Sequence, residues 1–357
     1  MRILSVVGAR PQFVKLAPIA KAMHDRAEHI VVHTGQHYDE LMSEVFFRDL
    51  GIPQPNVNLG VGSGKHGAQT GAMIGALEPV FETYDPDWVL AYGDTNSTLA
   101  AAVAATKLHL PLAHLEAGLR SFNRRMPEEH NRVLTDHSAD LCLAPTLAAL
   151  ERLGVEGLSD RSILVGDVMT DVLFETRDAI AEQPGALPDG VRPGEYYVST
   201  IHRPDNTDSA ERLARIIEQL ANLDRPVLLL VHPRLASLAA GFGIDLGQGH
   251  IRPIDPLPYP ALVGAVRGSA GVITDSGGLQ KEAFLLRVPC TTIRSETEWT
   301  ETVQLGWNVL VDSDLASLAS VVQRPTPPAT DAQPYGDGHA AVRVVDALLT
   351  WNTDRRG

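Results

Sequence analysis

Three acidic residues lie where an α/β protein commonly places reactive groups, after apolar strand-like runs or at the start of a helix. Asp94 follows the run 88–92, and Glu116 follows the run 112–115. Glu128 comes after a proline and falls in the first turn of a predicted helix. If the three carboxylates converge, their repulsion raises the pKa of at least one of them. One carboxyl group can then act as an acid and another as a base in proton transfer. The structural alternatives are a helix N-cap for Asp94 and a favourable helix-dipole charge for Glu128.

Two arginine-proline turns have the composition of anion-binding sites. In the first, Gly-Ala-Arg-Pro at positions 8–11, Arg10 can form a forked pair with phosphate, and Lys15 lies about one helical turn further on. In the second, His202 and Arg203 follow a later strand, so the histidine can protonate or hydrogen-bond a departing phosphate. A surface arginine and lysine in the first turn, and a capping or core histidine in the second, are the structural alternatives.

The glycine-rich segment 275–282, Asp-Ser-Gly-Gly-Leu-Gln-Lys-Glu, carries the strongest phosphate signal. It follows a predicted strand and opens a helix, so Ser276 and the backbone amides of Gly277 and Gly278 can hold a diphosphate. Glu282, one turn inside that helix, can accept the hydroxyls of a ribose. A tight turn alone explains the two glycines but not the whole run.

These segments need a scaffold, and the hydrophobic pattern predicts one. Short β-branched runs alternate with helical patterns along the chain, which indicates an α/β fold with two doubly wound, Rossmann-like parallel sheets and a cleft between them. We expect domains at 1–167 and 168–338, followed by a C-terminal helical segment at 339–357. The predicted strands are 3–7, 29–34, 88–92, 112–115, 141–144, 196–200, 227–231, 250–254, 271–274, 290–293 and 309–311. The predicted helices include 15–24, 39–50, 70–83, 97–107, 128–138, 147–153, 209–223, 279–286 and 339–351.

Composition excludes several classes of function. The chain has 357 residues and a formal net charge of −14, which disfavours a nucleic-acid surface. No apolar stretch is long enough to span a membrane, and the N-terminus has no signal-peptide core. Cys142 and Cys290 lie in or beside apolar runs, as expected for buried thiols of a cytoplasmic protein.

Two attractive binding signals fail the test of context. The segment 62–67 has the spelling of a dinucleotide loop, but it follows no clear strand and the next predicted helix starts later. His29, His33 and His37 have helical metal spacing, but they lie in or next to a predicted strand. We therefore expect neither a nicotinamide cofactor nor a metal site.

Taken together, the motifs resemble those of the non-hydrolysing UDP-N-acetylglucosamine 2-epimerases. The resemblance runs from Arg2 to Gly338 and keeps the order of every motif. The matching segments are 8–11, 36–37, 93–95, 116–120, 127–129, 202–203 and 275–278.

This resemblance implies a GT-B architecture, with the C-terminal helix crossing back to the first domain, and a set of roles. The catalytic carboxylates would be Asp94, Glu116 and Glu128, with His202 as partner of the leaving group. A homodimer acting on a UDP-sugar is expected. The substrate-binding residues would be Arg10, Lys15, Gln36, His37, Arg132, Arg203, Ser276, Gly277, Gly278 and Glu282.

The chain also departs from the family pattern. Lys281 stands before Glu282, where many members have a second acid. An Arg-Gln pair of the family's activating site is replaced near 63–64, so we do not expect activation by substrate. Segments 34–39, 60–70 and 294–299 look closer to a branch acting on UDP-2,3-diacetamido-glucuronate.

The expected reaction inverts carbon 2 of UDP-N-acetylglucosamine. The proton on carbon 2 is not beside a carbonyl, so its direct removal is implausible. Departure of UDP from carbon 1 acidifies that proton, and a carboxylate then removes it to leave a glycal. Re-protonation on the other face and return of UDP complete the inversion. A hydrolysing epimerase, a GT-B glycosyltransferase and a non-catalytic sugar-nucleotide sensor are the alternatives.

Overall fold

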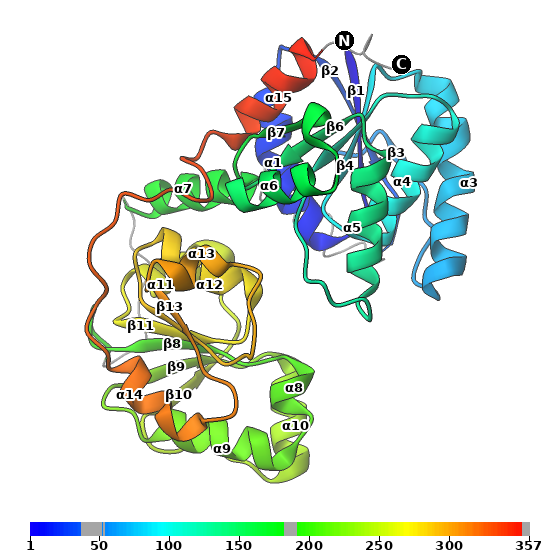
Figure 1. Ribbon diagram of the computed structural model, residues 1–357. Coiled ribbons are helices and arrows are strands. Elements are labelled where there is room, and N and C mark those ends of the chain that lie inside the picture. The colour runs from blue at the N-terminus through cyan, green and yellow to red at the C-terminus, as the bar shows by residue number, and fades with distance from the viewer. Residues whose placement is uncertain (37–51, 53, 182–190, 352–357) are drawn as a thin grey trace. The chain divides into compact units, whose positions relative to one another are not determined.

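The computed structural model describes residues 1–36, 52, 54–181 and 191–351, and these form two compact units (Figure 1). Unit 1 comprises Met1–Val172 with Gln333–Gly357, and unit 2 comprises Leu173–Ala332. The predicted helix 39–50 and His37 lie outside the described residues. No helix in the described ranges has the length and apolar character to cross a membrane.

Unit 1 is built on a parallel sheet of seven described strands. In the central strands the apolar residues are buried on both faces, which is typical of parallel strands covered by helices on either side. In spatial order the strands are β3 (Val57–Asn58), β2 (Glu28–His33), β1 (Arg2–Val7), β4 (Trp88–Tyr92), β5 (Leu112–Leu115), β6 (Leu141–Ala144) and β7 (Ser162–Leu164).

Helices cover both faces of this sheet. One face packs on α1 (Arg10–Met23) and α15 (Ala340–Thr350), and the other on α3 (His66–Tyr84), α4 (Asn96–Lys107) and α6 (Leu147–Val155). The C-terminal helix α15 thus returns to the unit in which the chain begins. Asp171 in α7 (Val168–Ala181) fixes this return, because its carboxylate accepts the first amides of α15 at 3.0 and 2.7 Å. The remaining helices are α5 (Pro127–Ser138) and the short η1 (Ser159–Arg161).

Unit 2 repeats the plan with a parallel sheet of six described strands. In spatial order these are β10 (Ile251–Ile254), β9 (Val227–Leu230), β8 (Tyr197–Thr200), β11 (Gly271–Thr274), β12 (Cys290–Thr292) and β13 (Asn308–Leu310). One face packs on α9 (Ala210–Ala221), α10 (Pro233–Phe242), η2 (Leu315–Ser317) and α14 (Leu318–Val322). The other packs on α11 (Tyr259–Arg267) and α12 (Gly277–Leu285), while α8 (Pro204–Thr207) and α13 (Thr300–Gln304) complete the unit.

Each sheet has one point where the strand order reverses. In unit 1 the chain runs outward from β1 to β3 and returns to place β4 beside β1. In unit 2 it runs from β8 to β10 and returns to place β11 beside β8. Open α/β sheets bind ligands outside the carboxyl ends of strands at such switch points. The motifs after β1, β4, β8 and β11 therefore lie where this rule places a site.

The structure confirms the predicted α/β class with two doubly wound sheets, and it adds detail. Two short edge strands, β3 and β7, were not predicted, and α3 begins at His66 instead of residue 70. The segment 62–67 therefore does lie between a short strand and a helix, contrary to the sequence-based interpretation. Both cysteines are buried free thiols.

Candidate active site

The turn after β1 is fixed by tight packing and by one glutamine. A side chain at Gly8 would collide with the hydroxyls of Thr34 and Ser97, so only glycine fits. The Gln12 side chain accepts from the Gly8 and Ala9 amides at 2.8 and 3.0 Å and donates to the Tyr92 carbonyl at 2.8 Å. It thereby joins the turn after β1 to the end of β4. Arg10 begins α1, and its side chain lies outside the described part of the structure.

Two of the predicted catalytic acids follow neighbouring strands and are each paired with a cation. Glu116 follows β5 and forms an ion pair with Lys15 of α1. Asp94 follows β4 and lies 2.5 Å from the guanidinium of Arg132 in α5. An added Cβ at Gly93 would lie 3.3 Å from the Glu116 carboxylate and 3.4 Å from the Lys15 ammonium. The structure therefore brings Lys15 and Glu116 together beside the turn that carries Asp94.

The electrostatics of this cluster keep Lys15 charged. Burial alone lowers the pKa of Lys15, but the negative charges of Glu116, Asp94 and Asp167 outweigh it and raise the pKa overall. Glu116 has φ +74°, a left-handed conformation that costs a non-glycine residue energy. Strain of this kind persists where the surroundings over-determine a position, and it is common at functional sites.

A buried ion network lies under these turns. Asp136 of α5 accepts from His114 Nδ1 at 2.6 Å, from the Gly118 amide at 3.1 Å and pairs with Arg120 at 2.7 Å. His114 Nε2 in turn lies 2.6 Å from the Gly93 carbonyl. Burial raises the pKa of Asp136, but His114 and Arg120 more than compensate and lower it overall. The network ties the turn after β4 to the turn after β5.

The third predicted acid, Glu128, has no such partner. It lies in the first turn of α5, partly buried, and makes no hydrogen bond or ion pair with the residues that the structure describes. Its neighbour Glu129 is structural, since it accepts from Ser121 and Phe122 at 2.9 Å and from Arg132 at 3.0 Å. Although burial opposes it, these donors lower the pKa of Glu129 overall.

Gln36 also has a structural place. It is buried, and its side-chain oxygen accepts from the amide and hydroxyl of Ser97 at 3.0 and 2.7 Å. Contact between Gln36 and a substrate stays a prediction.

In unit 2, His202 is positioned by a buried carboxylate. Asp275, directly after β11, lies 3.1 Å from His202 Nδ1 and accepts the backbone amides of His202 and Arg203 at 3.0 and 2.9 Å. Burial raises the pKa of Asp275, but His202, Asn206 and the Arg203 amide lower it overall. The His202 side chain is 45% exposed.

The glycine motif opens α12 as predicted. Ser276 is the N-cap, and Gly277 and Gly278 form the first turn. Glu282 lies one turn further in and accepts from the Tyr259 hydroxyl at 3.2 Å. Lys281, the departure from the family pattern, is buried with its ammonium 4.3 Å from the centre of the Trp299 ring.

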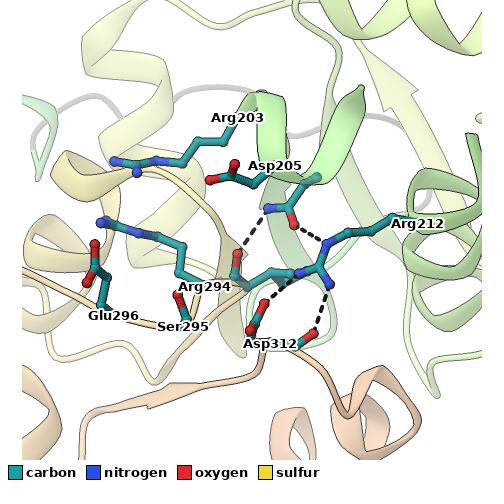
Figure 2. A pocket seen from close by; sticks show the side chains of 9 residues that line it. Arg203, Asp205, Arg212, Arg294, Ser295, Glu296 and Asp312 are labelled. Carbon is teal, nitrogen blue, oxygen red and sulfur yellow. Dashed lines mark hydrogen bonds and ion pairs between the residues drawn. The ribbon is translucent and has the colours of Figure 1, made fainter. Parts of the chain in front are cut away.

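A pocket of about 150 Å³ lies at the carboxyl end of the second sheet (Figure 2). Arg203 and Arg294 extend into the same side of it, while Arg212 is bound to Asn206 and Asp312 at 2.9 to 3.1 Å. The pocket is lined by Arg203, Asp205, Asn206, Arg212, Ile293, Arg294, Ser295, Glu296 and Asp312.

Sequence reasoning missed the buried polar residues that hold the turns and side chains of the candidate site in place. Gln12, Asp136 and Asn206 were not selected, and Asp275 was noted only as part of the glycine motif. Each is a buried polar residue, but nothing in a single sequence shows which turn it contacts. The described residues contain no group of three His, Cys, Asp or Glu side chains arranged to hold a metal ion.

The fold and the two switch-point sites define an α/β enzyme of GT-B architecture, and comparison with known proteins identifies the family. Residues 21–349 match the family model of UDP-N-acetylglucosamine 2-epimerase, and the chain belongs to this family. A Methanococcus maripaludis "UDP-N-acetylglucosamine 2-epimerase homolog" is 42% identical, covering 98% of this chain and 99% of the relative. A Pseudomonas aeruginosa UDP-2,3-diacetamido-2,3-dideoxy-D-glucuronate 2-epimerase is 43% identical, with the same two coverages.

Solved structures agree with this placement. The UDP-GlcNAc 2-epimerase of Methanocaldococcus jannaschii, in complex with UDP-GlcNAc and UDP, superimposes with a TM-score of 0.83 at 36% identity, covering 98% of this chain and 99% of that one. The Neisseria meningitidis enzyme bound to UDP-GlcNAc gives a TM-score of 0.85 at 27% identity, with 98% and 100% covered.

Proposed function

We propose that this protein inverts carbon 2 of UDP-N-acetylglucosamine to give UDP-N-acetylmannosamine, by elimination and re-addition of UDP. Family membership supports the reaction, and the Lys15–Glu116 pair beside Asp94 is the observation that carries it in this chain. A carboxylate held in position is what removal of a weakly acidic carbon-bound proton requires.

The reaction balances in two steps. First, the bond between carbon 1 and the phosphate oxygen breaks, UDP leaves with the electron pair, and a carboxylate takes the proton from carbon 2. A 2-acetamidoglucal remains. A proton then adds to the other face of carbon 2, and UDP re-forms its bond to carbon 1. No redox step occurs, so the reaction consumes no nicotinamide.

The chain's residues fit distinct parts of this scheme. Glu116, held beside the charged Lys15, serves as the base, and Glu128, without a cation partner among the described residues, serves as the acid on the other face. In the reverse direction the two exchange roles. Asp94, paired with Arg132, adds negative charge that stabilises the cationic character at carbon 1.

In this proposal, unit 2 supplies residues that bind UDP. His202, oriented by Asp275, donates to the departing diphosphate, and Arg203 contacts it. The first turn of α12 presents the backbone amides of Gly277 and Gly278, where a helix N-terminus favours an anion. The Ser276 amide is held by the Thr274 hydroxyl at 2.9 Å.

The decisive experiment is NMR of UDP-N-acetylglucosamine with the enzyme in heavy water. Deuterium should enter carbon 2 of the recovered sugar nucleotide, and UDP-N-acetylmannosamine should form without added NAD or metal. Release of free N-acetylmannosamine would instead indicate a hydrolysing epimerase. Transfer to an acceptor with the carbon 2 hydrogen retained would indicate a glycosyltransferase.

The acid assignments are tested by Glu128→Gln. Turnover should fall by about 10²–10⁴-fold, the usual contribution of a positioned proton-transfer group, while UDP affinity stays unchanged. Glu151→Gln, on the exposed side of α6, is the matched control and should leave turnover unchanged. Loss of UDP binding with normal turnover of the bound fraction would contradict the catalytic role.

UDP-2,3-diacetamido-glucuronate is the second candidate substrate. The P. aeruginosa relative named for that sugar is 43% identical, whereas the M. maripaludis and M. jannaschii relatives named UDP-N-acetylglucosamine 2-epimerase are 37% and 36% identical. Turnover of the uronate with no turnover of UDP-N-acetylglucosamine would keep the reaction and change the substrate.

The proposal includes a homodimer in the cytoplasm. Light scattering should give twice the mass of the chain, and a monomer would contradict the dimer. A reducing compartment fits the two buried free thiols, and fractionation of the source cells tests it.

A further inference from the structure

The first turn of α12 is already covered by a charged pair. A side chain at Gly277 would collide with the carboxylate of Glu298, and Arg294 Nη1 would lie 3.8 Å from its Cβ. Glu298 and Arg294 are joined by an ion pair of 2.9 Å. A carboxylate therefore lies against the helix N-terminus at which the proposed function places a diphosphate.

Arg294 has donor capacity that this pair does not use. Its side chain is only 10% exposed, and Nη1 is buried. The contact with Glu298 has the distance of an ion pair but lacks the angles of a hydrogen bond, so Nη1 donates to no acceptor in the described part of the chain. A buried charged donor without a directed acceptor is costly, and a ligand oxygen can satisfy it.

Neighbouring charges favour the same site. Arg203 lies on the same side of the pocket as Arg294 (Figure 2), and its side chain makes no hydrogen bond or ion pair with a described residue. Arg212, in contrast, is fully engaged by Asn206 and Asp312. Among the described residues, the Arg203 side chain thus has no partner, and Arg294 has only its ion pair with Glu298.

We propose that Arg294 is a diphosphate-binding residue that exchanges Glu298 for the ligand. Without ligand, the Glu298 carboxylate holds Arg294 over the first turn of α12. When UDP binds, its diphosphate takes the position beside Gly277, Glu298 moves away, and Arg294 donates to the phosphate oxygens as a forked donor. Glu298 therefore competes with the ligand for the same cation.

The inference rests on the proposed function, because it presumes that the first turn of α12 binds the diphosphate of UDP. Calorimetric titration with UDP and with uridine separates the two claims. Failure of the wild-type protein to bind UDP would contradict the proposed function. Normal UDP binding with no effect of Arg294 substitution would overturn the inference alone.

The variants have opposite expected effects. Arg294→Gln should weaken UDP binding by about 10- to 100-fold, the effect of losing one charge-assisted hydrogen-bonded group, and should change uridine binding by less than about twofold. Glu298→Gln should strengthen UDP binding several-fold, because UDP then no longer has to displace a partly exposed ion pair, whose free energy is small. In the Arg294→Gln background, this gain from Glu298→Gln should shrink.

Controls separate this exchange from a structural pair. Arg215→Gln removes an exposed arginine of α9 and should leave UDP affinity unchanged, which tests for an effect of net charge. If Arg294→Gln fails to fold, Glu298→Gln alone still decides, because an unchanged or weaker UDP affinity overturns the proposal. Equal losses for UDP and uridine in Arg294→Gln would also overturn it, since they indicate a general distortion.

Discussion

Asp136→Asn tests whether the buried network under the turns after β4 and β5 positions Glu116. In the native protein the Asp136 carboxylate accepts hydrogen bonds from His114 and the Gly118 amide and forms an ion pair with Arg120. The other ring nitrogen of His114 contacts the Gly93 carbonyl. An asparagine in the same place keeps one acceptor oxygen but turns an NH₂ group toward a donor. Two turns of the site thus lose their common anchor.

The magnitude follows from burial and from the partners that remain. Asp136 and the Arg120 side chain are 0% and 2% exposed, and breaking a buried pair from one side typically costs about 3–5 kcal/mol. Arg120 keeps its two bonds to Glu156, at 2.9 and 2.7 Å, which favours the lower end of that range. For a unit of this size the unfolding midpoint should fall by roughly 6–20 °C.

Activity should fall as well, in a way that a purely structural role does not produce. A displaced Glu116 should lower kcat by about 10- to 100-fold, since misplacing a catalytic group by about 1 Å can have this effect. UDP affinity should remain unchanged, because the proposed UDP-binding residues lie mainly in unit 2. Thermal unfolding, steady-state kinetics and UDP titration on one preparation measure all three quantities.

Asp140→Asn is the matched control. Asp140 accepts the Leu112 amide at 2.9 Å at the amino end of β5, the strand whose carboxyl end carries Glu116. Asparagine keeps an oxygen that can accept this amide, so the change should cost at most about 1 kcal/mol and leave kcat unchanged. Equal destabilisation by the two variants, or a normal kcat in a folded Asp136→Asn enzyme, would refute the positioning role.

Two further predictions concern stability. Burial lowers the pKa of His29 to about 4, so the unfolded chain binds an extra proton as pH falls from about 6.5 toward 4, and His29 should contribute about 2 kcal/mol to a loss of stability between pH 7 and 5. Burial lowers the pKa of His33 as well, so urea unfolding of His29→Gln should show a smaller loss, not none. An equal loss in both proteins would contradict the assignment. Gly8→Ala forces a methyl group onto the Thr34 and Ser97 hydroxyls and should destabilise the protein by about 1–3 kcal/mol, whereas Gly71→Ala, in open space on α3, should stabilise it by roughly 0.5–1 kcal/mol. Equal midpoints for the two alanine variants would show that the Gly8 turn can relax.

The scaffold was predictable because its signals are local. Strands such as β4 and β6 are short apolar runs buried on both faces, and such runs stand out from the polar turns around them. β3 and β7 escaped prediction because they are two and three residues long, with no fully buried residue to mark them. The early start of α3 at His66 was missed because Lys65, its N-cap, makes no side-chain capping bond.

The positions of the candidate site residues could be predicted from the sequence, but the residues that contact them could not. Glu116 and His202 follow recognisable strands, so their positions at the sheet edge could be inferred. Their partners, Lys15 for Glu116 and Asp275 for His202, lie 101 and 73 residues away. Such pairings depend on strand order and side-chain direction, which no local pattern contains.

The two units solve one physical problem in the same way. A turn at a switch point exposes backbone amides that must find acceptors, and a buried polar side chain supplies them in each unit. Gln12 binds the amides after β1 and reaches the end of β4, while Asp275 after β11 binds the amides of His202 and Arg203 after β8. In both cases one side chain fixes two turns relative to each other before any ligand arrives. Binding free energy is then not consumed in ordering the turns, which is the condition for a preorganised site.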